Sequence, residues 1–341
     1  MEFYQIKPGG HYGLSAVLKN GKVKEIRPQV LRKLKFPDYQ KKLYEKSLSI
    51  VCNYTFQDKT RGWNKNIKAI CHPFREDKLS IFPDNIDLWK LSESDFVDEI
   101  WIEAHRGRRR DKYDFCIFTI DTEQGIKCKG YHAVPLILQA ANEMGLHGFL
   151  LDYYPTTMIK ATPNPKEKYS LAHQLTKTRK KLARCKNVEI ECGTRNQKQL
   201  SKIIRTSRFV IFPNNKDASP RMIPETIIRG TPLLVNKNIY GGWKYITKTN
   251  GMFFDSPPSM RELDEKPDYY KEEFKKALGH MMDTKWNPTH IIDEYYSDYG
   301  FFRAAGKLAK VVNKVEGHDD YKFVFYRNFA PLMAQWRKLK R

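Results

Sequence analysis

Long apolar runs are missing from this 341-residue sequence. No stretch approaches the roughly 18 apolar residues that a membrane-spanning helix needs. The opening MEFYQIKPGG lacks the basic region and the apolar stretch of a secretory leader. Six cysteines are present, but none forms a CxxC pair, so the spacing of a zinc finger is absent. We therefore expect a cytoplasmic protein with free thiols, either soluble or peripherally attached to a membrane.

Acidic residues are scarce relative to basic ones. The sequence has 61 Lys and Arg residues against 39 Asp and Glu residues, which gives a net charge of +22. This excess suits a nucleic acid, an anionic membrane surface or a phosphorylated substrate; the alternative is a basic solvated surface without a partner. Apolar residues make up 40% of the chain and aromatic residues 13%, which is the composition of a folded protein.

Strands and helices are predicted to alternate from Tyr113 onward. The run YDFCIFTI is short, apolar and rich in β-forming residues, as buried parallel strands are. Similar runs alternate with helical stretches of ten or more residues, which indicates βαβ units in a doubly wound parallel sheet. The predicted strands are 113–120, 146–154, 187–193, 208–213 and 231–236, and the predicted helices are 131–144, 168–185, 196–207 and 220–229.

The regions that flank this alternation are less regular. Residues 47–54 are the clearest predicted strand of the N-terminal part, whereas residues 81–94 have the Pro, Asn, Asp and Ser content of a connection. The charge run HRGRRRDK at 105–112 is the expected domain boundary. The predicted C-terminal helical stretches are 256–285 and 286–315.

Two carboxylates lie at a predicted helix entry in the stretch NKDASPRMIPETIIRGTPLLVN. Asp217 and Glu225 are separated by seven residues. Ser219 suits the N-cap and Pro220 the first helical position, so the helix would begin at the carboxyl end of strand 208–213. That edge of an open α/β sheet binds ligands, and a helix N-terminus there suits a phosphate. Carboxylates can accept hydrogen bonds from sugar hydroxyls, so the pair fits a nucleotide-sugar. The alternative is a turn residue and a surface acid.

This region resembles the donor-binding domain of GT-B glycosyltransferases, close to glycosyltransferase family 4. In that family a Lys-Gly precedes a helix, two acids separated by seven residues precede a Gly-Thr-Pro, and a Gly-Gly loop follows. The residues that match are Lys129, Gly130, Asp217, Glu225, Gly230, Thr231, Pro232, Gly241 and Gly242. The sequence departs from the family at Asp217, where Glu is more usual, and at Glu123, where the family often has Arg.

The resemblance implies an α/β protein of the GT-B type, with two Rossmann-like domains and additional C-terminal helices. Residues 1–108 would form a short, irregular N-terminal domain on the acceptor side. Residues 109–285 would bind the nucleotide-sugar donor, and helices within 286–341 would pack back across the domains.

The implied activity is transfer of a sugar from a nucleotide diphosphate-sugar to a hydroxyl of a glycan, glycolipid or glycoprotein. Retention of anomeric configuration is implied as well, and neither a metal ion nor another cofactor is expected. Lys129, with help from Lys127, would neutralise the diphosphate. Glu225 would hold the ribose and Asp217 the sugar hydroxyls, so these two acids and Lys129 are the expected catalytic residues.

The resemblance also implies the wider environment of the donor. Backbone N–H groups within 219–222 would cradle the diphosphate, residues 193–195 would lie near the base, and residues 241–242 would let the backbone approach the donor sugar. The residues expected there are Gly130, Gly193, Thr194, Arg195, Ser219, Pro220, Arg221, Met222, Gly241 and Gly242. On the acceptor side, the loop of Gly9, Gly10 and His11 is expected, and His11 would be the base if the enzyme inverts.

Two other functions stay open at this stage. A basic nucleic-acid-binding protein would use the clusters at 106–110, 177–181 and 337–341, although helix-turn-helix and RNP-like signals are absent. A nucleotide-sugar-binding scaffold would keep the fold without the reaction. We expect a nucleotide-sugar and a sugar-bearing acceptor as partners, with peripheral contact to an anionic membrane as an option and no nucleic acid.

Overall fold

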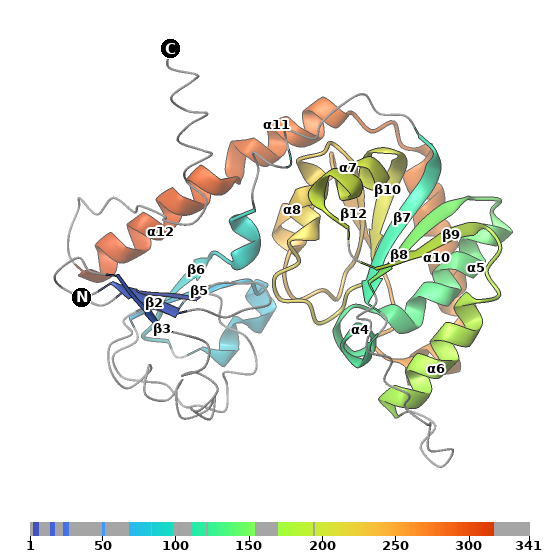
Figure 1. Ribbon diagram of the computed structural model, residues 1–341, viewed down its shortest axis with the longest axis horizontal. Helices are drawn as coiled ribbons and strands as arrows, with labels where there is room; N and C mark the ends of the chain where they lie inside the picture. Colours follow the sequence, from blue (N-terminus) through green and yellow to red (C-terminus); the bar gives the residue numbers. More distant parts are fainter. Residues whose placement is uncertain are drawn as a thin grey trace.

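The structure, a computed structural model, describes residues 68–97, 102, 111–153 and 170–316, apart from residues 83, 121 and 194. Four strands at 3–6, 14–17, 23–26 and 50–51 are described as well. Figure 1 shows a smaller N-terminal half and a larger α/β half, with two C-terminal helices running from the larger half to the smaller one.

A six-stranded parallel sheet forms the centre of the larger half. Its strands are β7 (Tyr113–Ile120), β8 (Gly148–Tyr153), β9 (Val188–Cys192), β10 (Ser207–Phe212), β11 (Leu233–Asn236) and β12 (Gly251–Phe254). They are ordered β12-β11-β10-β7-β8-β9, and every neighbouring pair is parallel. The predicted doubly wound sheet is therefore confirmed. The winding direction reverses between β7 and β10, which makes this the topological switch point.

Helices cover both faces of the six-stranded sheet (Figure 1). They are α4 (Glu123–Cys128), α5 (Val134–Glu143), α6 (Leu171–Leu182), α7 (Gln197–Arg205), α8 (Met222–Ile227), α9 (Met260–Glu265) and α10 (Pro267–Asp283). Successive side chains of a strand point to opposite faces. Phe115 of β7 accordingly lies in a core cluster with residues of α5 and α10, whereas Cys116 lies in a second cluster with residues of α7 and α8.

The N-terminal half contains two small sheets. One is antiparallel and consists of β1 (Phe3–Ile6), β2 (Leu14–Val17) and β3 (Val23–Ile26). The other is parallel and consists of β4 (Ile50–Val51), β5 (Ala69–His72) and β6 (Asp87–Lys90). Since β6 lies within 81–94, the prediction of a connection there was wrong. Leu88 and Trp89 pack against apolar clusters on either side of the small sheet, and this packing outweighs the polar residues around them.

The two predicted C-terminal helical stretches are each broken into two helices. Pro267, which has no N–H to donate, begins α10 directly after α9. Gly300, with φ +106°, separates α11 (Pro288–Asp298) from α12 (Phe301–Glu316). No helix in the described part of the chain is long and apolar enough to cross a membrane.

The last two helices contact different halves of the molecule. Ile291 and Tyr295 of α11 belong to the core cluster of α7 and α8 in the larger half. Ala304 and Val311 of α12 pack against Cys71 of β5 in the N-terminal half. The chain thus returns across the first half after completing the large sheet (Figure 1).

Candidate active site

Two of the predicted donor-site residues meet at the carboxyl ends of β7 and β10. Lys129 follows α4, the helix after β7, and Asp217 lies in the loop after β10. Their side chains form an ion pair although they lie 88 positions apart in the sequence. This pair lies at the topological switch point, where open α/β sheets bind ligands in the crevice beyond their strands.

The Asp217 carboxylate is held through one of its two oxygens. The Asn214 side-chain amide donates to Oδ2 at 2.8 Å, and the Lys129 ammonium contacts the same oxygen. The Asp217 side chain is 11% exposed and that of Lys129 24%, so both can be reached from solvent. Because these two donors share Oδ2, the lone pairs of Oδ1 can accept a ligand hydroxyl. Asn214 was not predicted, although it lies three residues before the acid.

A close backbone contact fixes the position of Lys129. Gly130 has φ +65°, and a Cβ built on it would lie 2.0 Å from the carbonyl oxygen of Pro213. The backbone N–H of Asn215 also donates to the carbonyl of Cys128 at 3.1 Å. The turn that carries Lys129 is therefore seated directly on the loop that carries Asp217, which requires glycine after the lysine.

The electrostatic environment of this turn is basic. Burial is the main reason why the pKa of the Cys128 thiol is raised. Three lysines oppose that shift, Lys127, Lys129 and Lys216, whereas Asp217 is the one carboxylate that adds to it. Lys127 and Lys216 are exposed. Three ammonium groups around one carboxylate leave a net positive charge, which suits a multiply charged anion such as a diphosphate.

Glu225 is buried rather than at the surface. The residue is 8% exposed, which excludes the alternative of a surface acid. Gln197, at the start of α7, donates to Glu225 Oε2 at 3.3 Å, and Arg229 Nη1 lies 3.9 Å from the same oxygen. The carboxylate thus lies between α8 and the N-terminal end of α7, beside the end of β9.

Arg229 is the residue of this network that sequence reasoning missed. Its side chain is 0% exposed, and its guanidinium donates to Ser201 Oγ at 2.8 Å, Gln197 Oε1 at 2.7 Å and the carbonyl of Glu225 at 2.6 Å. Burial lowers the pKa of Arg229 to about 10, so the side chain stays cationic at neutral pH. The i,i+4 spacing of Glu225 and Arg229 within the predicted helix 220–229 was the available signal.

Comparisons with known proteins bear on the fold. No protein-family model and no curated protein matches the chain in sequence. Among solved structures, the lipopolysaccharide outer core galactosyltransferase WaaB matches with a TM-score of 0.51 at 11% identity, over 84% of this chain and 81% of WaaB. The pneumococcal O-GlcNAc transferase GtfA, solved with UDP and GlcNAc, matches with a TM-score of 0.50 at 10% identity, over 93% of this chain and 70% of GtfA. The chain has the GT-B glycosyltransferase fold.

The extent of the match varies among structures with this fold. A GtfA/B complex matches over 80% of this chain with a TM-score of 0.45 and 10% identity, and this chain spans half the length of that one. The family 4 assignment is not tested by these likenesses and stays a prediction.

Ser219 does not cap a helix in this GT-B fold, contrary to the prediction. Helix α8 begins at Met222, with Arg221 in the N-cap position and no side-chain cap bond, and it is shorter than the predicted 220–229. The Ser219 hydroxyl instead accepts a hydrogen bond from the backbone N–H of Ser94 at 2.9 Å. A tertiary contact between the two halves has therefore replaced the local cap that the Ser-Pro pair suggested.

The Gly241–Gly242 pair packs against the loop of the first acid. A Cβ on Gly241 would lie 1.8 Å from the carbonyl oxygen of Ala218, and one on Gly242 would lie 2.6 Å from Pro220 Cγ. The N–H of Gly241 also donates to the carbonyl of Asp217 at 2.8 Å. Packing of the protein accounts for both glycines, and their approach to a donor sugar stays a prediction.

The remaining predicted residues lie at or near the end of β9, or outside the described residues. Gly193 has φ +105° and its N–H donates to the carbonyl of Asp152 at 3.0 Å. Arg195 forms an ion pair with Glu191 at 2.6 Å. Residues whose placement the structure does not describe are Gly9, Gly10, His11 and Thr194.

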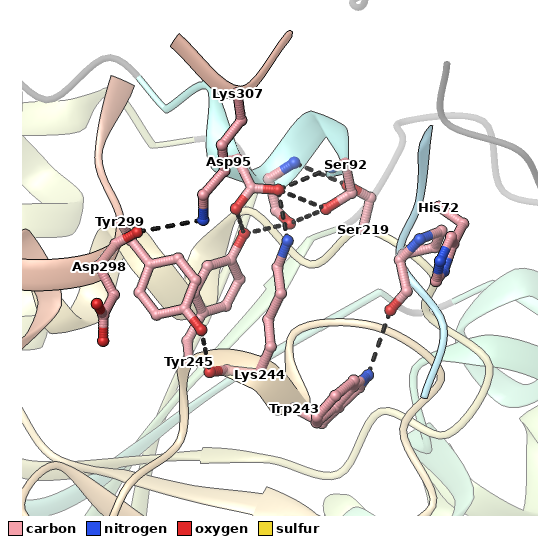
Figure 2. Close-up of polar contacts among 12 residues, drawn as sticks. His72, Ser92, Asp95, Ser219, Trp243, Lys244, Tyr245, Asp298, Tyr299 and Lys307 are labelled. Carbon is pink, nitrogen blue, oxygen red and sulfur yellow. Dashed lines mark hydrogen bonds and ion pairs between the residues drawn. The ribbon is translucent and has the colours of Figure 1, made fainter. Parts of the chain in front are cut away.

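A buried polar cluster joins the two halves of the GT-B fold next to Ser219 (Figure 2). Asp95 accepts from the Lys244 ammonium at 2.5 Å and from the Tyr245 hydroxyl at 2.8 Å. Ser94 shares a hydrogen bond of 3.0 Å with the same hydroxyl. Burial lowers the pKa of Lys244, and Asp95 opposes that shift. The cluster fixes the 241–245 loop, and through it the Asp217 loop, against the N-terminal half.

His72, the last residue of β5, lies near this interface (Figure 2). Its Nδ1 accepts a hydrogen bond from the backbone N–H of Phe74 at 3.2 Å. Burial, then Lys244 and Lys90, lower its pKa to about 4, so the ring is neutral at pH 7 and carries its proton on Nε2. Nε2 of His72 is therefore a hydrogen-bond donor, and the lone pair of Nδ1 is already engaged. Within the described residues, no group of three or more His, Cys, Asp or Glu side chains could hold a metal ion.

Proposed function

We propose that this protein transfers a sugar from a nucleotide diphosphate-sugar to an acceptor hydroxyl. The observation that carries the proposal is the Lys129–Asp217 pair at the switch point of a GT-B fold, with two further lysines around it. Such a crevice offers cations for a diphosphate and a carboxylate for sugar hydroxyls. The UDP and GlcNAc present in the GtfA structure support a ligand of the same class.

In the proposed reaction the bond between the sugar C1 and the diphosphate oxygen breaks. That oxygen keeps the electron pair, the acceptor oxygen bonds to C1, and the acceptor proton leaves with the nucleoside diphosphate or to water. Negative charge therefore grows on the diphosphate in the transition state. Lys129 has two N–H donors beyond the one on Asp217, and these would stabilise that charge together with Lys127 and Lys216.

The two acids have different tasks in this proposal. Asp217 Oδ1 would accept a hydroxyl of the transferred sugar, since Oδ2 is already engaged with Lys129 and Asn214. Glu225 would accept the ribose hydroxyls, at the end of the crevice where Gln197 begins α7. The nucleoside would thus lie toward β9 and the transferred sugar toward β10.

We also propose retention of configuration and no requirement for a metal ion, both as the family 4 resemblance implies. Retention needs no protein base. Five described cysteines are free thiols, which supports a reducing, cytoplasmic setting, either in solution or at an anionic membrane surface.

Thermal unfolding with a panel of nucleoside diphosphates and nucleotide-sugars, in EDTA, tests the donor site. A ligand at one hundred times its Kd stabilises the protein by about 2.7 kcal/mol, so binding raises the Tm. We expect an upward shift with one base, which EDTA does not reduce and which Lys129→Met abolishes. Lys198→Met, at an exposed position of α7, is the matched control.

Glu225→Gln is a better probe of the second acid than truncation to alanine. Alanine would leave Arg229 buried without its carboxylate, which destabilises the fold for reasons unrelated to the donor.

A donor that binds without transfer or hydrolysis would support the inactive scaffold. No nucleotide shift, together with a salt-sensitive shift by an oligonucleotide, would refute the proposal and support nucleic-acid binding.

A further inference from the structure

A cavity of about 240 Å³ lies between the two halves of the molecule, beside the Lys129–Asp217 pair. A space of this size can admit a monosaccharide unit. The residues that line it are Arg75 and Asp77 from the N-terminal half, and Asn215, Lys216, Asn238, Ile239, Tyr240 and Pro258 from the larger half.

The walls of the cavity are loops at the carboxyl edges of two parallel sheets. Arg75 follows β5 of the small sheet, and the other wall consists of the loops after β10, β11 and β12. Arg75 Nη1 donates to the carbonyl of Lys237 at 2.7 Å, which joins the two edges directly. A molecule in this space would contact both halves at once, as an acceptor meeting a bound donor must.

The cavity begins where the donor site ends. Lys216 is the neighbour of Asp217 in the chain, and its backbone N–H donates to the carbonyl of Cys128 at 3.2 Å, next to Lys129. The cavity extends from there toward β11 and β12, whereas Glu225 lies on the other side with α7. A nucleotide-sugar with its ribose at Glu225 would therefore present its sugar to this cavity.

The chemistry of the lining fits a sugar that carries negative charge. Arg75 Nε lies 3.3 Å from Asp77 and Nη1 donates to Lys237, so the guanidinium, which has five N–H donors, keeps donors for an anion. Lys216 is exposed, and no bond from its ammonium group is found among the described residues, which leaves one uncompensated positive charge. Tyr240 packs against the apolar cluster of the N-terminal half and supplies an aromatic wall, while Asn238 supplies an amide.

We infer that this cavity binds the acceptor, and that the acceptor is a sugar or polyol carrying a phosphate or carboxylate group. Lys216 and Arg75 hold the anionic group, and the carboxylate of Asp77 and the amide of Asn238 bind hydroxyls. The inference rests on the proposed function, because it assigns the second substrate of the same reaction.

Sugar transfer to a hexose 6-phosphate, a hexuronic acid and the matching neutral hexose tests the inference. With the donor that binds best, we expect kcat/KM to be at least about tenfold higher for one anionic acceptor than for the neutral hexose, since a charged hydrogen bond is lost with the neutral one. The two anionic acceptors distinguish a phosphate from a carboxylate. Calorimetric binding of each sugar to the protein saturated with nucleoside diphosphate gives a second readout that needs no turnover.

Lys216→Gln should raise KM for the anionic acceptor by about tenfold relative to KM for the neutral hexose. Because Lys216 also lies near the diphosphate, Arg75→Gln, on the N-terminal wall of the cavity, should raise the same KM without altering donor KM. Lys198→Gln controls for loss of surface charge. Equal use and equal binding of neutral and anionic sugars, or an Arg75→Gln effect on donor KM alone, would overturn the inference.

Measuring the slow hydrolysis of the donor by water distinguishes a failure of this inference from a failure of the proposed function. Hydrolysis and donor binding without any preference for anionic sugars would overturn the acceptor assignment alone. Absence of both donor binding and hydrolysis would refute the proposed function, and the acceptor assignment with it.

Discussion

At the scale of single residues, the candidate site consists of charged side chains whose orientations are restricted by their hydrogen-bond partners. Asp217 is held through one oxygen by Asn214 and Lys129. Arg229 is fully buried, and each nitrogen of its guanidinium donates one hydrogen bond. Breaking such contacts leaves a buried partner without its hydrogen bond, which costs more than the contact itself contributes. The informative substitutions are therefore those that keep the shape of a side chain and remove one charge or one hydrogen bond.

Gly130→Ala should destabilise the protein more than Gly145→Ala. Both glycines have a left-handed φ, +65° and +70°, so both substitutions carry a backbone cost of about 1–2 kcal/mol. A Cβ on Gly130 also meets the carbonyl of Pro213, whereas one on Gly145 meets nothing within 4 Å. We expect a further cost of about 1–3 kcal/mol at Gly130 in urea unfolding. Equal costs would contradict the close seating of the Lys129 turn on the Asp217 loop.

Gln197→Ala should weaken recognition of the ribose without changing the reaction. Arg229 orients the Gln197 amide, and this amide positions Glu225, which is proposed to accept ribose hydroxyls. We expect the preference for a nucleoside diphosphate over its 2′-deoxy analogue to fall about tenfold in the variant, with kcat nearly unchanged. Gln139→Ala, at an exposed glutamine of α5, is the control. An unchanged preference would remove Gln197 from the ribose site.

At the scale of elements, the site depends on short loops that are each held by a neighbour. The Asp217 loop lies between the Lys129 turn on one side and the Gly241–Gly242 loop on the other. The latter loop is in turn fixed by Asp95 of the short helix η3 (Glu93–Asp95). Helix α8 contributes little to this arrangement by itself, since it has only six residues and no side-chain cap bond.

Lys244→Met should destabilise the protein by about 3–5 kcal/mol, because it leaves Asp95 buried without its cation. The two side chains are 6% and 5% exposed and lie 2.5 Å apart. The double variant with Asp95→Asn should recover part of the loss, since no charge is then buried. Lys276→Met, whose partner Glu273 lies 2.8 Å away at the surface of α10, should cost no more than about 1 kcal/mol. Similar costs in urea unfolding for the two single variants would contradict a buried interdomain ion pair.

At the scale of the whole molecule, the two halves are joined by more than one contact. The Asp95 cluster connects them beside the site, and α12 packs on the small sheet after α11 has packed on the large half. Figure 1 shows this return of the chain. Because the acceptor cavity has walls from both halves, its shape depends on how firmly these contacts hold them together.

Val311→Asp should separate the unfolding of the two halves. Val311 is 0% exposed in the cluster that joins α12 to β5, and a carboxylate there would be buried without a partner. We expect calorimetry to show one transition for the original protein and two for the variant. Lys310→Asp introduces the same charge at an exposed position of α12 and should keep a single transition. One unchanged transition in both variants would show that α12 does not couple the halves.

The pattern of residues along the chain predicts the large sheet and several residues of its crevice. Short apolar runs such as 113–120 predict buried parallel strands, because the tendency to form a buried strand depends mainly on residues adjacent in the sequence. The observed β7 has the same bounds as this run. The order of strands and helices then implies a doubly wound sheet, whose crevice lies at the carboxyl ends of the strands. Lys129 and Asp217 could be placed there without knowing that they touch.

Which of these residues share a contact depends on how distant segments of the chain pack together. The Lys129–Asp217 pair, the Arg229–Gln197 bond and the Asp95–Lys244 pair join positions far apart in the chain, and no local pattern encodes the spacing of loops across a sheet. Long-range packing also explains why the prediction of an N-cap at Ser219 was wrong. Its hydroxyl accepts a hydrogen bond from the N–H of Ser94, in the other half of the protein. Local propensities are weak compared with packing, so the packing of the two halves determines the final geometry of the site.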